Sequence, residues 1–557
     1  MNVPLVRSDV ESNARPGRPR VAILGGGFGG VYAAMRLEQL RRRRDEFDIT
    51  LVNSENYFVF QPMLPEVISG SIGILDTVSP LRRLLPRTQL LIREIESIDL
   101  QSRSVMLSQG FRPRPYVLKY DHLVLALGTV TDFRTMPGLH EHALPFKNLA
   151  DAVQLRNHLI HVLEEAAIET DTELKRQLLT FVIAGGGFSG VEVAAELNDF
   201  VRRVAREIPG IDRSEIHVVL LHSGAMILDR ELTKKLSAYA NKILQRRGVE
   251  IRLHSRLRTA TPDSAVLESG ERIMTKTLIS TVPSLPNPII ESLPLPKEKG
   301  KVRTSEYLSV VDTDGIWAIG DCALVINPSG EGFAPPTAQH AIRQANIAAN
   351  NIVATLRSHK KESYGFEGLG KMGSLGYRSA VAELFGGIKL SGLFAWILWR
   401  SIYWWKLPGL DRKLKVGLAW ALDLLIPPEL VQLKLASSQG ISQSHFEPGE
   451  PVFRQGDLGD SLYIILNGEA DVVREENGTE RILARLRGGQ FFGEMALMNQ
   501  KTRNATVRCA TAMDVLVLRK GDFRALVSNL PDFRASFENV VKARTEHAPL
   551  SEKSGEV

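Results

Sequence analysis

The hydrophobic pattern of the chain opens with an apolar run at residues 21–24, a glycine-rich turn, and a stretch with helical periodicity through Leu40. A second apolar run at 49–53 follows it. The order strand, turn, helix, strand predicts the beginning of a βαβ unit. The same order returns at 181–197, where a strand-like run at 217–222 again follows. Two copies separated by about 160 residues predict two nucleotide-binding units, because repeat arrays recur at much shorter periods.

The residue composition and the hydrophobic pattern change twice in the remainder of the chain. Further strand-like runs at 122–128 and 315–321 lie between and after the two copies. Beyond Ala380 the sequence turns apolar, aromatic and basic, and a polar linker at 436–444 ends that region. The C-terminal part alternates short apolar strands with glycine turns, as in 460–473, before a closing helix. This last pattern predicts a β-rich module.

Length and composition set the frame for these units. A chain of 557 residues with 44% hydrophobic and 24% charged residues can form about three or four domains with substantial cores. Its only cysteines, Cys322 and Cys509, are too far apart for a disulfide framework, which favours a reducing, cytosolic setting. Residues 1–18 are polar and lack the apolar stretch of a signal peptide, so we expect a disordered tail there.

Two glycine fingerprints carry the clearest chemical signal. Each has the spacing G-x-G-x-x-G, and each lies between a predicted strand and a predicted helix. The first glycine allows a tight turn, the second admits a pyrophosphate, and the third lets helix and strand pack closely. The motif glycines are Gly25, Gly27 and Gly30 in the first copy and Gly185, Gly187 and Gly190 in the second.

With both fingerprints in place, the sequence resembles the two-dinucleotide disulfide-reductase-like flavoproteins, whose first site takes FAD and whose second takes NAD(P)H. Ala126–Thr129 is similar to the family's element at the crossover between domains. The run Gly315–Cys322 is similar to its second FAD motif, and the resemblance implies that Asp321 contacts the ribityl chain of the flavin.

Three segments, at 56–65, 190–192 and 335–341, narrow this resemblance, because with them the chain resembles the type II NADH dehydrogenases over residues 18–434. Disulfide reductases and sulfide:quinone reductases need a redox-active cysteine pair, which this sequence does not offer. The matching pieces are Asn56–Pro65, Gly190–Glu192 and Pro335–Ala341. The resemblance implies that NAD(P)H passes a hydride to FAD and that two electrons then reach a membrane quinone.

The resemblance also implies site residues. FAD is expected at Gly25, Gly27, Phe28, Gly29, Gly30, Asn53, Gly128, Asp321 and Ala338, and NAD(P)H at Gly185, Gly187, Phe188, Gly190 and His222. Glu192, Gln339 and Gln61 are the expected catalytic residues, and no metal is expected. Glu192 is expected to relay protons to the quinone, although a glutamate in a first helical turn can also serve the helix dipole alone.

Three positions depart from the family pattern. Arg343 stands where the family's quinone element has its second glutamine, so the quinone pocket, formed with Gln339, is open in its details. His222 replaces the carboxylate that binds the ribose 2′-hydroxyl of NADH, so NADPH is also possible. Asn53, at the matching position of the FAD unit, can still hydrogen-bond a ribose hydroxyl.

The aromatic and basic region predicts contact with a membrane surface. Segment 385–434 holds seven basic and three acidic residues together with five of the six tryptophans. Its apolar stretch at 390–405 is shorter than the ~20 residues needed to span a bilayer, and a second helix is predicted at 414–426. Such helices lie in the membrane interface, while a core or dimer-interface pair is the alternative. We expect a peripheral protein on the cytoplasmic side of the cell membrane, and a homodimer.

The C-terminal module contains Phe492–Leu497 and Arg503–Val507, with nine positions from Glu494 to Arg503, and with these segments it resembles cyclic-nucleotide-binding domains over roughly residues 440–545. The resemblance implies that Glu494 accepts a hydrogen bond from the ribose and that Arg503 pairs with the cyclic phosphate. The expected ligand residues are Gly493, Glu494, Arg503, Asn504 and Ala505, and Asn504 leaves cAMP and cGMP both open. The alternative is that these segments are kept only as a remnant of the fold and bind no nucleotide. No helix-turn-helix follows, so nucleic acid is not an expected partner.

These inferences predict an α/β chain with two Rossmann-like domains, amphipathic membrane-associating helices and a β-roll cyclic-nucleotide-binding domain. The expected bounds are a tail at 1–18, an FAD domain at 19–145 and 305–380, an NAD(P)H domain at 146–304, helices for membrane binding or dimerisation at 381–434, the β-roll at 435–545 and a tail at 546–557. The predicted function is a non-proton-pumping NAD(P)H:quinone oxidoreductase under cyclic-nucleotide control. The alternatives are a diaphorase or ferredoxin reductase with a soluble acceptor, and a low-turnover redox sensor.

Overall fold

A computed structural model of the 557-residue chain describes most of its length. The described residues are 17–42, 46–108, 116–130, 136–281, 285–327, 332–423, 431–433, 441–457, 461–476, 479–494 and 503–519. The predicted N-terminal tail, apart from its last two residues, and the predicted closing helix lie outside these ranges.

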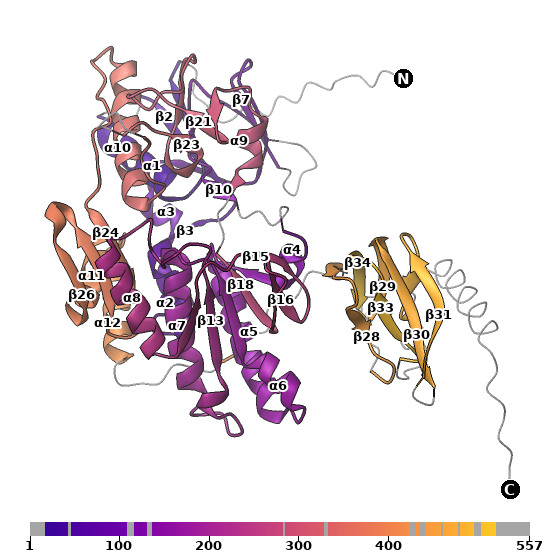
Figure 1. The fold of residues 1–557 in the computed structure, drawn as a ribbon. Coiled ribbons are helices and arrows are strands. Elements are labelled where there is room, and N and C mark those ends of the chain that lie inside the picture. Colours follow the sequence, from indigo (N-terminus) through magenta and orange to yellow (C-terminus); the bar gives the residue numbers. More distant parts are fainter. Residues whose placement is uncertain are drawn as a thin grey trace, which may run out of the picture.

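The first unit is built on a five-stranded parallel sheet in the upper part of Figure 1. Its strands, in spatial order, are β22 (Ile316–Ala318), β9 (His122–Leu125), β1 (Arg20–Leu24), β2 (Asp48–Asn53) and β5 (Gln89–Ile92). Helices α1 (Phe28–Leu40) and α10 (Ala338–Leu356) pack on each other beside it. The strands read as continuous apolar runs because helices and loops cover both faces of a parallel sheet.

The second unit repeats this plan between the two halves of the first. Its parallel sheet has the order β11 (Ala143–Pro145), β18 (Thr277–Ser280), β12 (Thr180–Ala184), β13 (His217–Leu221) and β14 (Val249–Arg252). Its helices are α5 (Leu149–Ile168), α7 (Phe188–Val204) and α8 (Lys234–Arg246). A small antiparallel sheet is added by β15 (Leu257–Ala260), β16 (Ser264–Leu267) and β17 (Arg272–Met274).

Two chain segments cross between these units. The outgoing segment contains β10 (Thr129–Val130) and α4 (Leu139–His142), and the returning segment contains β19 (Leu285–Pro286). Strands β10 and β19 pair with each other in antiparallel fashion. The two crossings are therefore tied together at the junction of the units.

The aromatic and basic region combines a sheet with two helices. Strands β24 (Gly370–Ser374), β25 (Ala380–Leu384) and β26 (Lys389–Gly392) form an antiparallel sheet, and α11 (Leu393–Lys406) and α12 (Leu410–Leu422) follow it. The first helix begins later than the apolar stretch at 390–405 predicted, because residues 389–392 pair with β25. The second begins four residues earlier than predicted, and residues 424–430 lie outside the described ranges.

The C-terminal module is a β-roll of two four-stranded antiparallel sheets. Their orders are β27 (Ile441–Phe446), β34 (Met513–Arg519), β29 (Ser461–Asn467), β32 (Phe491–Phe492), and β28 (Pro451–Phe453), β33 (Thr506–Cys509), β30 (Glu469–Glu476), β31 (Thr479–Arg487). Its own apolar core includes Phe446, Ile465 and Val515. The module lies beside α4 and β15, on the side of the second unit away from α11 and α12 (Figure 1).

Candidate functional site

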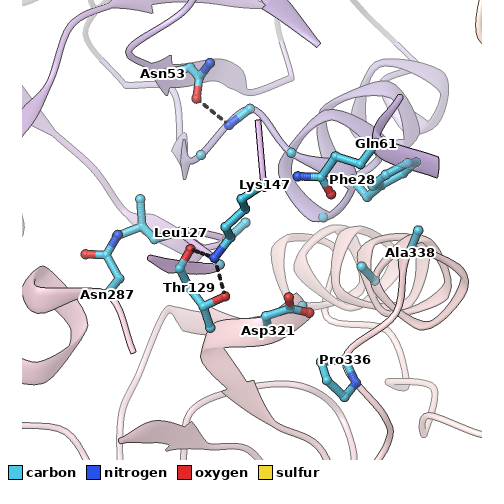
Figure 2. A pocket seen from close by; sticks show the side chains of 18 of the residues that line it. Phe28, Asn53, Gln61, Leu127, Thr129, Lys147, Asn287, Asp321, Pro336 and Ala338 are labelled. Atoms are coloured by element: carbon cyan, nitrogen blue, oxygen red, sulfur yellow. Dashed lines mark hydrogen bonds between the residues drawn. The ribbon is translucent and has the colours of Figure 1, made fainter. Parts of the chain in front are cut away.

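A cavity of about 780 Å³ lies at the carboxyl ends of the first parallel sheet (Figure 2). The loops after β1, β2, β9 and β22 line it, as ligand sites in open α/β sheets require. The start of α10 closes one side through Ala338, and α7 of the second unit contributes Ser189 and Glu192. The cavity therefore joins the two nucleotide-binding units.

The first glycine turn is shaped for an anion. Gly25 has a φ of 108°, and a Cβ on Gly30 would lie 1.8 Å from the Gly25 carbonyl oxygen, so only glycine fits there. A Cβ on Gly27 would meet no atom within 4 Å, because this residue faces the open cavity. No side chain caps α1, so its first backbone N–H groups can bind a phosphate.

Asn53 braces this turn. Its Oδ1 accepts a hydrogen bond of 2.8 Å from the Gly26 N–H, and its Nδ2 donates to the Glu55 carbonyl at 2.9 Å. The sequence predicts a hydrogen bond from Asn53 to a ribose hydroxyl. In the structure Asn53 lines the cavity, while its amide oxygen already holds the glycine turn in place.

Lys147 and Asp321 face each other across the floor of the cavity in Figure 2. The Lys147 ammonium donates to the Thr129 carbonyl at 2.5 Å and to its hydroxyl at 2.9 Å. Burial lowers the pKa of Lys147 and raises the pKa of Asp321, and each group's charge opposes the shift. Sequence reasoning missed Lys147, because nothing local distinguishes it from any lysine that follows a strand.

These features fit a flavin dinucleotide. The cavity combines a helix start that can bind a phosphate, a carboxylate that can accept hydrogen bonds from hydroxyl groups and a lysine beside it. The predicted FAD residues lie in its wall, with the exception of Gly30, which packs against Gly25. Those in the wall are Gly25, Gly27, Phe28, Gly29, Asn53, Gly128, Asp321 and Ala338.

The second glycine turn has the same geometry. Gly185 has a φ of 125°, and a Cβ on Gly190 would lie 1.8 Å from its carbonyl oxygen. His222 packs against Gly186 in the way that Asn53 packs against Gly26. Phe188 lies beside Gly373 of β24, so the start of α7 is also in contact with the sheet that precedes α11 and α12.

Carboxylates surround His222. Its Nε2 lies 3.7 Å from Asp229 Oδ1, and a Cβ on Gly187 would lie 3.0 Å from Glu231 Oε1. Burial raises the pKa of Glu231, with the Asp229 charge adding to the effect. The loop after β13 therefore brings negative charge to His222. The fingerprint expects a carboxylate at the end of the strand, and so it gives no indication of this loop.

Glu192 stands where the two units meet. It shares the cavity wall with Gln61, and its Oε1 accepts a 3.0 Å hydrogen bond from the Ser374 N–H. Burial raises its pKa to about 8, and the neighbouring Glu196 adds to the rise. Tyr403 of α11 lies close enough for the Glu192 charge to raise the tyrosine pKa further above the value set by burial. A carboxyl group with such a pKa can give and take a proton near neutral pH.

Gln339 and Arg343 lie beyond this wall. Gln339 Nε2 donates to the Gly370 carbonyl at 3.1 Å, and its Oε1 accepts from the Leu369 N–H at 3.0 Å. The Arg343 guanidinium is exposed and lies 5.2 Å from the centre of the Phe366 ring. The structure thus brings Glu192 and Gln61 together, while Gln339 fastens β24 to α10 and Arg343 lies one helical turn further on.

Helices α11 and α12 present an apolar face to solvent. On α12 the exposed side chains recur every fourth residue, which places them on one face. The exposed residues of both helices are Leu393, Phe394, Ile397, Trp404, Trp405, Leu410, Leu414, Leu418 and Leu422. Within the described part of the chain, no helix combines the length and apolar character that a membrane crossing requires.

A buried polar cluster attaches these helices to the first unit. Arg400 of α11 forms a 2.9 Å ion pair with Glu66 of α2 (Leu64–Ser69), and Trp420 of α12 donates to the other Glu66 oxygen at 2.9 Å. Glu66 is 2% exposed and Arg400 is 9% exposed. One side of the helix pair is thus held by the protein, and the apolar side chains of the other side are exposed.

In the β-roll, Arg503 is buried beside Gly493. Its guanidinium donates to the Gly493 carbonyl at 2.7 Å and to the Ser461 carbonyl at 2.9 Å, and it lies 4.0 Å from the centre of the Phe453 ring. Glu494 is buried as well, Ala505 is half-buried and Asn504 is exposed. The structure therefore gathers the predicted ligand residues on adjoining segments.

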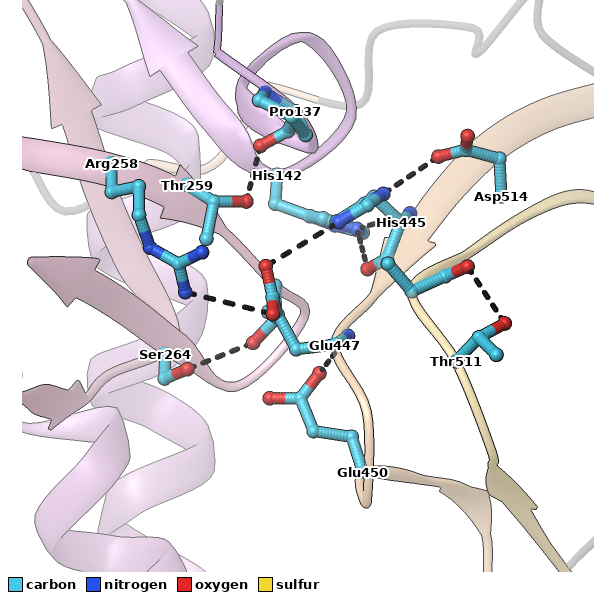
Figure 3. A network of polar contacts seen from close by, with 12 residues as sticks. Pro137, His142, Arg258, Thr259, Ser264, His445, Glu447, Glu450, Thr511 and Asp514 are labelled. Atoms are coloured by element: carbon cyan, nitrogen blue, oxygen red, sulfur yellow. Dashed lines mark hydrogen bonds and ion pairs between the residues drawn. The ribbon is translucent and has the colours of Figure 1, made fainter. Parts of the chain in front are cut away.

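The β-roll contacts the second unit through charged and histidine side chains (Figure 3). The backbone N–H of His445 donates to His142 Nε2 at 3.1 Å, and Asp514 Oδ1 lies 2.6 Å from His445 Nδ1. Arg258 lies 3.6 Å from Glu447. Burial lowers the pKa of His142 to about 4, so its ring is neutral at physiological pH and can accept.

A second ion pair extends this contact. Arg272 Nη1 lies 2.7 Å from Glu450 Oε1. At Gly138 a Cβ would lie 3.0 Å from the His445 Cβ, so the backbones approach closely. Since α4 belongs to the outgoing crossover and precedes Lys147 by five residues, the β-roll is docked directly on the segment that connects the two dinucleotide units.

Comparison with protein families assigns both parts of the chain. Residues 19–345 match the pyridine nucleotide-disulphide oxidoreductase family, and residues 443–529 match the cyclic nucleotide-binding domain. The first match spans more than half of the chain.

Individual relatives agree with the first assignment. Demethylphylloquinone reductase NdbB of Synechocystis is 32% identical over 410 residues, which cover 72% of this chain and 96% of that protein. Type II NADH:quinone oxidoreductase Ndh of Mycobacterium tuberculosis is 28% identical over 450 residues, covering 78% and 93%. The structure of NDH2 from Plasmodium falciparum in complex with NADH covers 74% of this chain and all of its own, with a TM-score of 0.68 and 18% identity, and so shares the fold.

Proposed function

This chain belongs to the pyridine nucleotide-disulphide oxidoreductases and, among them, to the type II NADH dehydrogenases, and from that premise we propose that it is an FAD-dependent NADH:quinone oxidoreductase at a membrane surface, controlled by a cyclic nucleotide. One observation carries the proposal. The glycine turn of the first unit and Glu192 of the second lie in the wall of a single cavity of about 780 Å³.

A flavin bound in this cavity supplies the hydride and electron chemistry, and the protein supplies binding, orientation and proton transfer. With a flavin dinucleotide bound, the start of α1 would hold the pyrophosphate, and Asp321 would accept hydrogen bonds from the hydroxyl groups of the sugar chain. Lys147 balances the charge of Asp321. Glu192 delivers a proton to the acceptor, since burial places its pKa near the working pH.

The carboxylates around His222 support a preference for NADH. The 2′-phosphate of NADPH would approach Asp229 and Glu231, which repel it. His222 alone would allow both NADH and NADPH to bind. The carboxylates of the loop after it favour NADH. Asp229→Asn should therefore improve use of NADPH relative to NADH, measured as the ratio of the two kcat/KM values, whereas an unchanged ratio would remove Asp229 from this role.

The exposed apolar face of α11 and α12 supports peripheral membrane attachment. Leucine and tryptophan side chains on one side of a helix pair, with basic residues between them, suit the interface of an anionic bilayer. A quinone dissolved in the bilayer would enter from this side, where Tyr403 of α11 adjoins Glu192. The same apolar face also suits a homodimer in the absence of lipid.

Control by a cyclic nucleotide would act through the docked β-roll. A cyclic phosphate at Arg503 would compete with the Gly493 and Ser461 carbonyls for the guanidinium. It would therefore change the conformation of the segments that hold Arg503. The β-roll contacts α4 of the outgoing crossover, so such a change can alter how the two dinucleotide units face each other. Among the described residues its contacts run to this crossover and to β15–β17, which makes the crossover the favoured route.

The test is NADH oxidation with a short-chain ubiquinone, titrated with cAMP and with cGMP, for the native chain and for Arg503→Ala. We expect quinone reduction in both proteins and a nucleotide effect in the native chain alone. Absence of quinone reduction would refute the enzymatic proposal. Quinone reduction that neither nucleotide changes, in rate, affinity or membrane binding, would refute the regulatory one.

A further inference from the structure

Glu196 lies one helical turn after Glu192 on α7 and reaches a different cavity. Glu192 lines the cavity of about 780 Å³, whereas Glu196 lines a second cavity of about 430 Å³. Residues four apart on a helix lie on the same face. The two carboxyl groups therefore stand side by side, each opening into its own cavity.

Ser374 of β24 contacts both carboxyl groups. Its N–H donates to Glu192 Oε1 at 3.0 Å, and its hydroxyl donates to Glu196 Oε1 at 3.4 Å. Glu196 is 6% exposed, and Ser374 is buried as well. Ser374 thus holds the two carboxyl groups beside each other between the two cavities, Glu192 through its N–H and Glu196 through its hydroxyl.

The second cavity leads to solvent. Six arginines line it, and two of them, Arg206 and Arg213, are exposed. Arg203 bonds the Ser69 carbonyl at 2.9 Å and pairs with Asp423 at 3.4 Å, while Arg400 is held by Glu66. The arginines favour water and anions in this cavity, so a buried acid in its wall can exchange protons with bulk water.

The surroundings of Glu196 keep it protonated at neutral pH. Burial raises its pKa to about 8, the same value that burial gives Glu192, and Glu66 of α2 and Asp199 of α7 add to the rise. Arg400 of α11 opposes it. Two carboxyl groups this close do not ionise together without cost, so the pair holds a proton that it can pass on.

We propose that Glu196 is a proton-relay residue for quinone reduction, which takes a proton from water in the arginine-lined cavity and passes it to Glu192, its neighbour one helical turn earlier on α7. This inference rests on the proposed function. NADH, a quinone and one proton give NAD⁺ and a quinol, so the hydride brings two electrons and one proton while the second proton comes from Glu192. The Glu192 carboxylate is then reprotonated by Glu196, and Glu196 by water.

The experiment compares two electron acceptors in the Glu196→Gln variant. A short-chain ubiquinone takes up protons with its electrons, whereas ferricyanide takes electrons only. We expect kcat with the quinone to fall by about tenfold or more, increasingly at higher pH, and kcat with ferricyanide to stay within about twofold. Glu196→Asp, which keeps the carboxyl group, should recover part of the loss.

Glu38→Gln is the matched control. Glu38 is a buried helical glutamate of α1 that accepts hydrogen bonds from the Arg87 N–H and the Thr88 hydroxyl, and it lines neither of the two cavities. Glu38→Gln should change kcat with the quinone and kcat with ferricyanide by the same factor. Equal loss with both acceptors in Glu196→Gln would show a merely structural role, and an unchanged quinone rate at every pH would overturn the relay.

A second measurement does not depend on turnover. Infrared difference spectra of the flavin-loaded protein without NADH or quinone, recorded between pH 6 and pH 10, follow the protonated carboxyl groups. The coupled pair should lose its protons in two separate steps in the native chain, and Glu196→Gln should leave a single step. An unchanged spectrum would contradict the assignment of Glu196, while a native chain that reduces ferricyanide but no quinone would instead refute the proposed function.

Discussion

Replacing Arg400 by methionine removes the only cation that the described structure pairs with Glu66. The ion pair is short, at 2.9 Å, and both partners are almost fully buried. Burial raises the pKa of Glu66 and Arg400 lowers it, so in Arg400→Met the carboxyl group keeps its desolvation cost without its counter-charge. Removing one partner of a buried pair costs about 3–5 kcal/mol. Trp420 remains as a donor at 2.9 Å, which places the expected loss toward the lower end.

Urea unfolding followed by tryptophan fluorescence measures this loss. Five of the six tryptophans lie in segment 385–434, so the signal reports on α11 and α12. A cost of this size should lower the urea midpoint by roughly 1–2 M. The double variant Glu66→Gln with Arg400→Met should recover much of the stability, because no buried charge is then left unpaired.

Lys415→Met is the control, because Lys415 is an exposed basic residue of α12. It should change the free energy of unfolding by less than about 0.5 kcal/mol. A loss below about 1 kcal/mol in Arg400→Met, or a double variant as unstable as the sum of the single ones, would refute the view that this pair anchors the helices.

Three further predictions concern attachment, docking and chemistry. Phe394→Glu combined with Leu414→Glu should weaken binding to anionic liposomes by at least about a hundredfold in a flotation assay, since each side chain contributes roughly 1.5–3 kcal/mol when buried; unchanged flotation would exclude this face. Burial depresses the pKa of His142 from 6.5 to about 4, so the docked contact should be complete above pH 6.5 and be lost as pH falls toward 4. Small-angle scattering of the native chain and of His142→Ala measures whether the β-roll is docked, since the chain becomes more extended when this contact is lost. A native chain that is still compact at pH 4 would contradict the prediction. Cys322→Ala should retain quinone reduction, because burial raises the pKa of this thiol to about 11 and keeps it unreactive; loss of turnover in a folded, flavin-loaded variant would point to cysteine chemistry.

The sequence predicted those features whose physics is local. Gly25 and Gly185 need a positive φ, and Gly30 and Gly190 need the absence of a Cβ. The spacing of the glycines therefore predicts both turns. The parallel strands around them read as apolar runs because they are buried on both faces. The paired sheets of the β-roll follow from alternation in the same way.

Features that depend on distant pairs could not be predicted. Glu196 acquires its meaning only when β24 brings Ser374 against it, 178 positions away. Glu66 and Arg400 are 334 positions apart, and neither has a neighbour in sequence that marks it as buried. Asp229 was overlooked because the expected carboxylate belongs at the end of β13, whereas here a loop carries it. The contact of the β-roll with α4 could not be predicted either, since contacts across domains leave no local pattern.

The most direct measurement is an anaerobic stopped-flow record of flavin absorbance. NADH mixed with the purified, flavin-loaded chain should bleach the flavin, and a second mix with a short-chain ubiquinone should restore its absorbance within one turnover. Both steps should proceed in the absence of any thiol reagent. A flavin that NADH reduces but quinone fails to reoxidise, or a chain that binds no flavin, would contradict its function as an NADH:quinone oxidoreductase.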